Sequence, residues 1–140
     1  KKIFLVNLPF KIKRNFKNIY NCHTALLPNY KGLLVIQRSI YDKLFHQNKS
    51  KIGITIHKLD KNFDNGQIIW NKEIKLNFDK KNKFKEIYEK FYLNFSYGID
   101  KISSNKKIKC LKVNNNTTHK NSISFYETLK LKLKLLWIQI

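Results

Sequence analysis

The sequence has few of the residues that build cross-linked or metal-bound frameworks. Its 140 residues include two cysteines, Cys22 and Cys110, and no methionine even at position 1. Cysteines this far apart fit neither a disulfide framework nor a zinc-site spacing, so we expect no metal and a reducing, cytoplasmic environment. No apolar run approaches the ~20 residues of a membrane span, and no phosphate loop or internal repeat is present. A chain that opens on Lys1 rather than methionine indicates a piece of a longer protein.

Negative charge is also scarce, because 9 acidic residues stand against 29 basic ones and the formal net charge is +20. Such a balance is typical of proteins that bind nucleic acid or an anionic membrane. However, 27 of the basic residues are lysine, and 27 Lys, 17 Asn and 18 Ile make up 62 of the 140 residues. Arginine, the better partner for phosphate, occurs twice. The composition therefore favours a coding bias toward lysine, with selection for a polyanionic partner as the alternative.

Hydrophobic residues make up 42% of the chain and aromatic residues 14%, which is enough for the core of one domain. Apolar alternation and helical spacing predict an α/β fragment. The predicted strands lie at 1–10, 19–22, 51–59 and 67–76, and the predicted helices at 33–45 and 84–102.

The composition changes after Ser103, and we divide the chain at residue 104. Residues 105–140 contain a polar run at 114–118, which predicts a linker. From 129 to 140 leucine alternates with lysine before an apolar end. This pattern predicts an edge strand or an apolar terminus, with a membrane-surface or partner-binding segment as the alternative.

Three polar side chains are candidates for chemistry. Asn21 and His23 are two residues apart at the end of a predicted strand, so they project to the same side. Asp64 follows the strand that carries His57, and the turn there can return its carboxylate to His23. A histidine can pass a proton near neutral pH, a carboxylate can orient it, and an amide can stabilise an oxyanion. Spacing alone favours a structural or surface role for the histidine over a catalytic one.

Two longer motifs contain these residues. Residues 21–32 read NCHTALLPNYKG, and residues 52–69 read IGITIHKLDKNFDNGQII. The first resembles the N-x-H-x-S-L-L-P-x-(Y/F)-(R/K)-G motif of folate-dependent formyltransferases. The second resembles the family's T-G-x-T-(I/V)-H-x-x-D-x-x-x-D-x-G-x-I-(I/L) motif. The resemblance implies that Asn21, His23 and Asp64 are catalytic.

The resemblance also implies a partial Rossmann-like fold, in which residues 1–104 form the C-terminal half of a formyltransferase catalytic domain. The implied reaction moves a formyl group from 10-formyltetrahydrofolate to a primary amine. The amine belongs to glycinamide ribonucleotide, methionyl-tRNA or a nucleotide-linked amino sugar, and tRNA is the only nucleic acid we expect as a partner. The implied contacts with the folate donor are Leu8, Pro9, Leu59, Asp60 and Phe63.

The sequence departs from the family pattern in several places. Ala25 replaces the motif serine, Ile52 replaces a threonine, and the family's N-terminal half is absent. The competing interpretation is therefore an inactive remnant that acts at most as a basic binding module.

The motifs do not assign a single role to each of the four further residues that lie within them. Cys22 is expected to be a buried thiol on the face opposite Asn21. His57 is either a strand-end histidine or part of the site. Tyr30 and Lys31 either pack or contact a ligand.

Overall fold

The computed structural model describes residues 1–8, 12–13, 17–46, 50–62, 64–78, 84–104, 110–111 and 123–137. In these ranges the chain forms four strands and three helices. They are β1 (Ile3–Val6), β2 (Ile19–His23), α1 (Val35–Phe45), β3 (Gly53–Lys58), β4 (Ile68–Glu73), α2 (Phe84–Ser104) and α3 (Phe125–Trp137). The first six of these elements match the predicted strands and helices to within a few residues.

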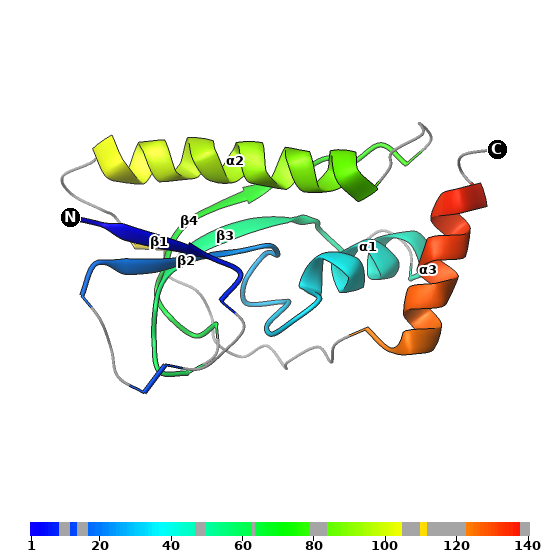
Figure 1. Cartoon of the computed structure of the whole chain (residues 1–140), viewed down its shortest axis with the longest axis horizontal. Helices are drawn as coiled ribbons and strands as arrows, with labels where there is room; N and C mark the ends of the chain where they lie inside the picture. The colour runs from blue at the N-terminus through cyan, green and yellow to red at the C-terminus, as the bar shows by residue number, and fades with distance from the viewer. Residues whose placement is uncertain are drawn as a thin grey trace.

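The four strands form one mixed sheet in the order β1-β2-β3-β4, so strands that follow one another in sequence also lie side by side (Figure 1). β1 and β2 are parallel, whereas β2, β3 and β4 are antiparallel. The register sets Asn21 opposite His57 and Cys22 opposite Ile56. The α/β class expected from the sequence is confirmed.

The pleat of the sheet separates an apolar face from a polar face. Cys22 and Ile56 point into the hydrophobic core, while their chain neighbours Asn21 and His57 point to the other side. Helix α2 lies along the apolar face (Figure 1) and contacts β3 and β4. The expectation that Cys22 is a buried thiol on the opposite face from Asn21 is therefore confirmed.

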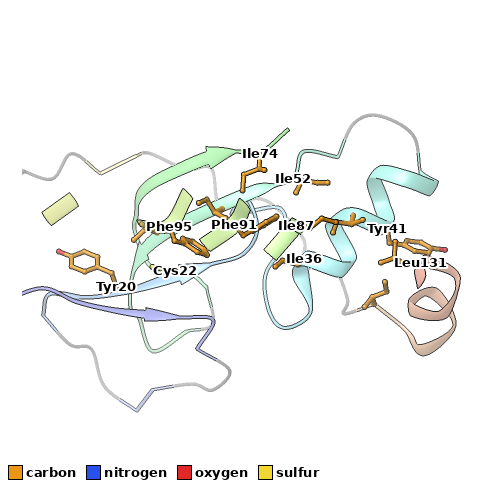
Figure 2. Packing of buried hydrophobic residues seen from close by; sticks show 14 of the residues in the cluster. Tyr20, Cys22, Ile36, Tyr41, Ile52, Ile74, Ile87, Phe91, Phe95 and Leu131 are labelled. Carbon is orange, nitrogen blue, oxygen red and sulfur yellow. The ribbon is translucent and has the colours of Figure 1, made fainter. Parts of the chain in front are cut away.

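Helix α2 buries one stripe of apolar side chains against the sheet. Ile87, Phe91 and Phe95 are spaced four residues apart and are almost completely buried (Figure 2). A Cβ atom at Gly98 would lie 2.6 Å from the indole ring of Trp70. The helix can approach β4 this closely because glycine has no side chain there.

Residues 129–137 belong to helix α3, so the prediction of an edge strand was wrong there, and residues 138–140 lie outside the described part of the chain. Ser124 and Glu127 form a capping box, in which the Glu127 N–H donates to Ser124 Oγ (3.2 Å) and the Ser124 N–H donates to Glu127 Oε2 (2.9 Å). Leu131 and Leu135, one turn apart, are buried against the core, and Leu131 lies beside Tyr41 of α1 (Figure 2). The strict alternation of leucine and lysine imitated a strand, but the helix needs only every second leucine for its buried face.

None of the described helices is long and apolar enough to cross a membrane.

Candidate active site

Asn21, His23 and Asp64 converge on the polar face of the sheet. Asn21 and His23 project from β2, and Asp64 lies in the turn that follows β3. Asp64 Oδ1 is 3.6 Å from His23 Nδ1 and 3.5 Å from Asn21 Nδ2. All three side chains are buried. The structure therefore brings together the three residues that the motifs singled out.

His57 belongs to the same cluster. Its Nδ1 lies 2.9 Å from the carbonyl of Lys58, which can only accept, so Nδ1 carries the proton. Its Nε2 lies 3.3 Å from the Asn21 amide nitrogen and 3.5 Å from Asp64 Oδ1. The sequence left its role open, and the pairing of β2 with β3 is what sets this imidazole beside the other three groups.

The orientation of His23 is fixed by a main-chain group. Its Nε2 lies 2.7 Å from the carbonyl of Tyr30, so Nε2 donates and, in the neutral ring, Nδ1 holds the lone pair. Burial lowers the pKa of His23, and so does the nearby His57. The Asp64 carboxylate and the Tyr30 carbonyl raise this pKa, but burial outweighs them and the pKa of His23 stays below the ordinary 6.5. His23 is therefore neutral at neutral pH, with Nδ1 directed at Asp64.

Asp64 is held as an ionised carboxylate. Its Oδ2 accepts a 2.7 Å hydrogen bond from the Gly32 N–H. Burial raises the pKa of Asp64, but the hydrogen bond with His57, the nearby His23 and the Gly32 N–H outweigh burial and leave the pKa below 3.8. The cluster at neutral pH thus consists of a carboxylate beside a neutral base.

Two cavities meet at this pair. The first has a volume of about 290 Å³ and is bordered by Asp64 and Lys31. The second has a volume of about 200 Å³ and is bordered by His23 and Gly32. The consecutive residues Lys31 and Gly32 border one cavity each, the two cavities share no bordering residue, and each cavity reaches one member of the pair.

The residues expected to contact a folate donor differ in whether they border a cavity. Leu8 borders the cavity that contains His23, and its N–H donates to Asn21 Oδ1 at 3.2 Å. Leu59 and Asp60 border neither cavity, and the Leu59 N–H donates to the Ile19 carbonyl. Pro9 and Phe63 lie outside the described residues.

Tyr30 and Lys31, whose roles the sequence left open, separate in the structure. Tyr30 packs, with its ring buried and its hydroxyl 3.0 Å from Asp42 Oδ2. Lys31 borders the larger cavity and donates to Asn65 Oδ1.

Burial raises the pKa of Cys22 to about 12, which agrees with a structural thiol. Among the described residues, no group of three or more His, Cys, Asp or Glu side chains is arranged to hold a metal ion.

The sequence analysis missed two residues that shape the site. Leu111 borders the larger cavity and its N–H donates to the Ile68 carbonyl at 2.9 Å, although it lies in the part of the chain assigned to a tail. No local signal marks it, since its contact is with a strand more than 40 residues earlier in the sequence. At Gly66 a Cβ atom would lie 1.7 Å from the Lys58 carbonyl oxygen. The D-x-G spacing after Asp64 signals this need for glycine.

Comparison with known proteins places the chain in a family. A family model described as formyl transferase matches residues 5–92, which is more than half of the chain. The chain therefore belongs to the formyl transferase family, whose members are transferases.

The sequence relatives include methionyl-tRNA formyltransferases. The protein of Thermosipho melanesiensis is 36% identical over 77 residues, which cover 54% of this chain and 23% of the relative. The protein of Halothermothrix orenii is 40% identical over 58 residues, which cover 41% of this chain and 16% of the relative. The matched stretch thus spans about a quarter or less of these relatives.

Solved structures show the same fold. The formyltransferase PseJ from Anoxybacillus kamchatkensis, in complex with UDP-4,6-dideoxy-4-formamido-L-AltNAc and tetrahydrofolate, gives a TM-score of 0.65 at 21% identity over 97% of this chain and 68% of its own. Phosphoribosylglycinamide formyltransferase from Bacillus halodurans gives a TM-score of 0.58 at 21% identity over 76% of this chain and 56% of its own. The partial Rossmann-like formyltransferase fold is confirmed.

Proposed function

We propose that this chain carries the catalytic groups for transfer of a formyl group from 10-formyltetrahydrofolate to a primary amine. The observation that carries the proposal is the convergence of Asn21, His23 and Asp64 in a buried cluster between two cavities. A transfer between two bound molecules needs two subsites that meet at a proton-accepting group. Tetrahydrofolate and a formamido sugar in the PseJ complex support the choice of donor and acceptor classes.

In this reaction His23 accepts the proton of the attacking amine and passes it on to the leaving nitrogen. As the amine nitrogen attacks the formyl carbon, it loses a proton to His23 Nδ1, the nitrogen not engaged by the Tyr30 carbonyl. The resulting imidazolium is stabilised by Asp64 Oδ1, 3.6 Å away. The proton then passes, through a bridging water, to N10 as the bond between N10 and the formyl carbon breaks. The products are tetrahydrofolate and a formamide.

The negative charge that develops on the formyl oxygen is stabilised by Asn21 and the His23 imidazolium. The Asn21 amide nitrogen lies 3.3 Å from His57 Nε2 and donates to Asp64 Oδ1 at 3.5 Å. Both contacts are at the long limit for hydrogen bonds. When Asn21 turns one N–H toward the oxyanion, it therefore gives up only a weak contact and forms a charge-assisted hydrogen bond in the transition state.

The acceptor is one of three amines: methionyl-tRNA, glycinamide ribonucleotide or a nucleotide-linked amino sugar. Methionyl-tRNA is the first acceptor to test, because the sequence relatives are named methionyl-tRNA formyltransferases. His57 instead favours the other two, because the methionyl-tRNA branch usually lacks histidine at this place in the motif.

The test is a transfer assay with 10-formyltetrahydrofolate and each of the three acceptors, with the formylated product measured by mass spectrometry. We expect one acceptor to be formylated, and Asp64→Asn and His23→Asn to lower kcat/KM by about 100-fold or more. Asparagine tolerates the left-handed backbone of Asp64, so Asp64→Asn removes the charge and keeps the turn. Glu73→Gln, at an exposed ion pair with Lys51, is the control and should retain full activity. A folded protein that formylates none of the acceptors would contradict the proposal.

A further inference from the structure

The carbonyl of Tyr30 decides which nitrogen of His23 is available as a base. While it accepts from Nε2 at 2.7 Å, the lone pair of the neutral ring is on Nδ1. Without this carbonyl, the Asp64 carboxylate would be the dominant acceptor near the ring. The proton would then move to Nδ1, and Nδ1 could no longer accept one from an amine. The position of Tyr30 therefore controls the chemical state of His23.

A buried carboxylate on α1 holds Tyr30 in place. The Tyr30 hydroxyl donates to Asp42 Oδ2 at 3.0 Å and lies 3.1 Å from Ser50 Oγ. Asp42 is 2% exposed, and its helix packs beside the loop that carries Tyr30. The hydroxyl and the carbonyl of Tyr30 thus bind groups on opposite sides of the residue, one on α1 and one on β2.

One cation, Arg38, and one further anion, Glu127, stabilise the charge of Asp42. Arg38 Nε lies 3.0 Å from Asp42 Oδ1, and Arg38 Nη1 lies 3.2 Å from Glu127 Oε1 of α3. A buried carboxylate is costly unless it is paired and hydrogen-bonded. Here both oxygens of Asp42 are engaged, one by Arg38 and one by Tyr30. The network runs without a break from α3 to the imidazole of His23.

We propose that Asp42 is a positioning residue for the formyl-transfer site: it anchors Tyr30, whose carbonyl keeps His23 protonated on Nε2 and open on Nδ1. This inference rests on the proposed function, but its first readout does not depend on turnover. No sequence pattern singles out Asp42, which lies 19 residues from His23 and outside both motifs.

The experiment records ¹⁵N NMR shifts of the His23 ring, assigned by the loss of its signals in His23→Asn. The wild-type protein and Asp42→Asn, which keeps an acceptor for the Tyr30 hydroxyl, should show the tautomer protonated on Nε2. Asp42→Ala and Tyr30→Phe should shift the population toward the tautomer protonated on Nδ1. Tyr30→Phe removes only the hydroxyl and keeps the ring, so it decides the matter even where Asp42→Ala fails to fold.

The second readout is turnover. We expect kcat to fall by about tenfold or more in Tyr30→Phe and Asp42→Ala, while KM for the donor changes less than about twofold, because a misplaced base slows chemistry without removing a binding contact. Asp42→Asn should restore most of the rate, and Glu73→Gln should change neither readout. An unchanged tautomer in Tyr30→Phe would overturn the inference, whether or not Asp42→Ala folds. A shifted tautomer in a protein that transfers no formyl group would support the positioning role and reject the proposed function.

Discussion

Asp64 holds a backbone conformation that few side chains adopt. Its φ is 48°, in the left-handed region where an aspartate is tolerated better than most residues. Strain of this kind costs roughly 1–3 kcal/mol and persists where surrounding contacts fix the residue. The contacts here are the Gly32 N–H at Oδ2 and the Asn21 amide at Oδ1. The strained turn therefore lowers the stability of the folded state, and it directs the Asp64 carboxylate at His23.

The state of His23 makes the stability of the protein depend on pH. Because the pKa of folded His23 is below 6.5, the unfolded chain takes up its proton first as the pH falls. The contribution of His23 is fully present above pH 6.5 and is lost as the pH drops through the folded pKa. Asp64, whose pKa is also lowered, adds a second loss below pH 3.8. We expect the free energy of unfolding to fall between pH 7.5 and pH 5.

Urea denaturation at these two pH values checks this prediction. The fall should be smaller in His23→Asn, which has no proton to gain at this position. Every other residue is the same in the two proteins, so the comparison isolates His23. Equal falls in the two proteins would show that burial does not depress the pKa of this residue.

The sequence predicted the three converging residues but not their surroundings. The spacing of Asn21 and His23 on a strand and the position of Asp64 after a second strand made convergence possible, because pleat and turn geometry are local, and the resemblance of the two motifs singled out the three residues. The contacts of His57 and Asp42 depend on strand register and on helix packing. Neither of these is encoded in a short window of residues.

Among the elements, α3 shows how a pattern can be misread. Leu129, Leu131, Leu133 and Leu135 alternate with lysine, and alternation is typical of a strand. The capping box at Ser124 and Glu127 was the signal for a helix start. The helical spacing at 33–45 and 84–102 was unambiguous, and the structure confirmed those helices as α1 and α2.

The packing of α3 predicts unequal effects for two similar substitutions. Leu131 is fully buried, whereas Leu133 is 51% exposed on the same helix. We expect Leu131→Ala to lower the free energy of unfolding by about 2–5 kcal/mol. Leu133→Ala makes the same chemical change and should stay within about 0.5 kcal/mol of wild type. Urea denaturation of the two variants measures the difference, and similar effects would mean that α3 does not dock through this face.

At the scale of the whole chain, lysine is spread through nearly every segment of the sequence rather than gathered in one. Exposed lysines occur on strand, turn and helix alike, for example Lys58 on β3, Lys61 in the following turn and Lys101 on α2. A site selected for nucleic acid would group its cations on one face with aromatic residues able to stack. The expectation that the charge reflects composition rather than a specific nucleic-acid site stays a prediction.

Binding measurements across a salt series test it. Affinity for an unrelated DNA duplex and for a tRNA should be similar and should fall together, by orders of magnitude, between about 50 and 200 mM salt. Tight tRNA binding that survives about 200 mM salt, with no matching affinity for the duplex, would show a selected site and would favour methionyl-tRNA as the acceptor.

The two cavities beside the His23–Asp64 pair have a kinetic consequence. They share no bordering residue, since Lys31 and Asp64 border one and Gly32 and His23 border the other, so we expect that a molecule in one cavity does not block entry to the other. Under the proposed function, donor and acceptor are then bound at the same time, and no covalent formyl-enzyme intermediate is needed between two half-reactions. For such a site, double-reciprocal plots at several fixed concentrations of the second substrate intersect, whereas a shared cavity used in turn would give parallel lines.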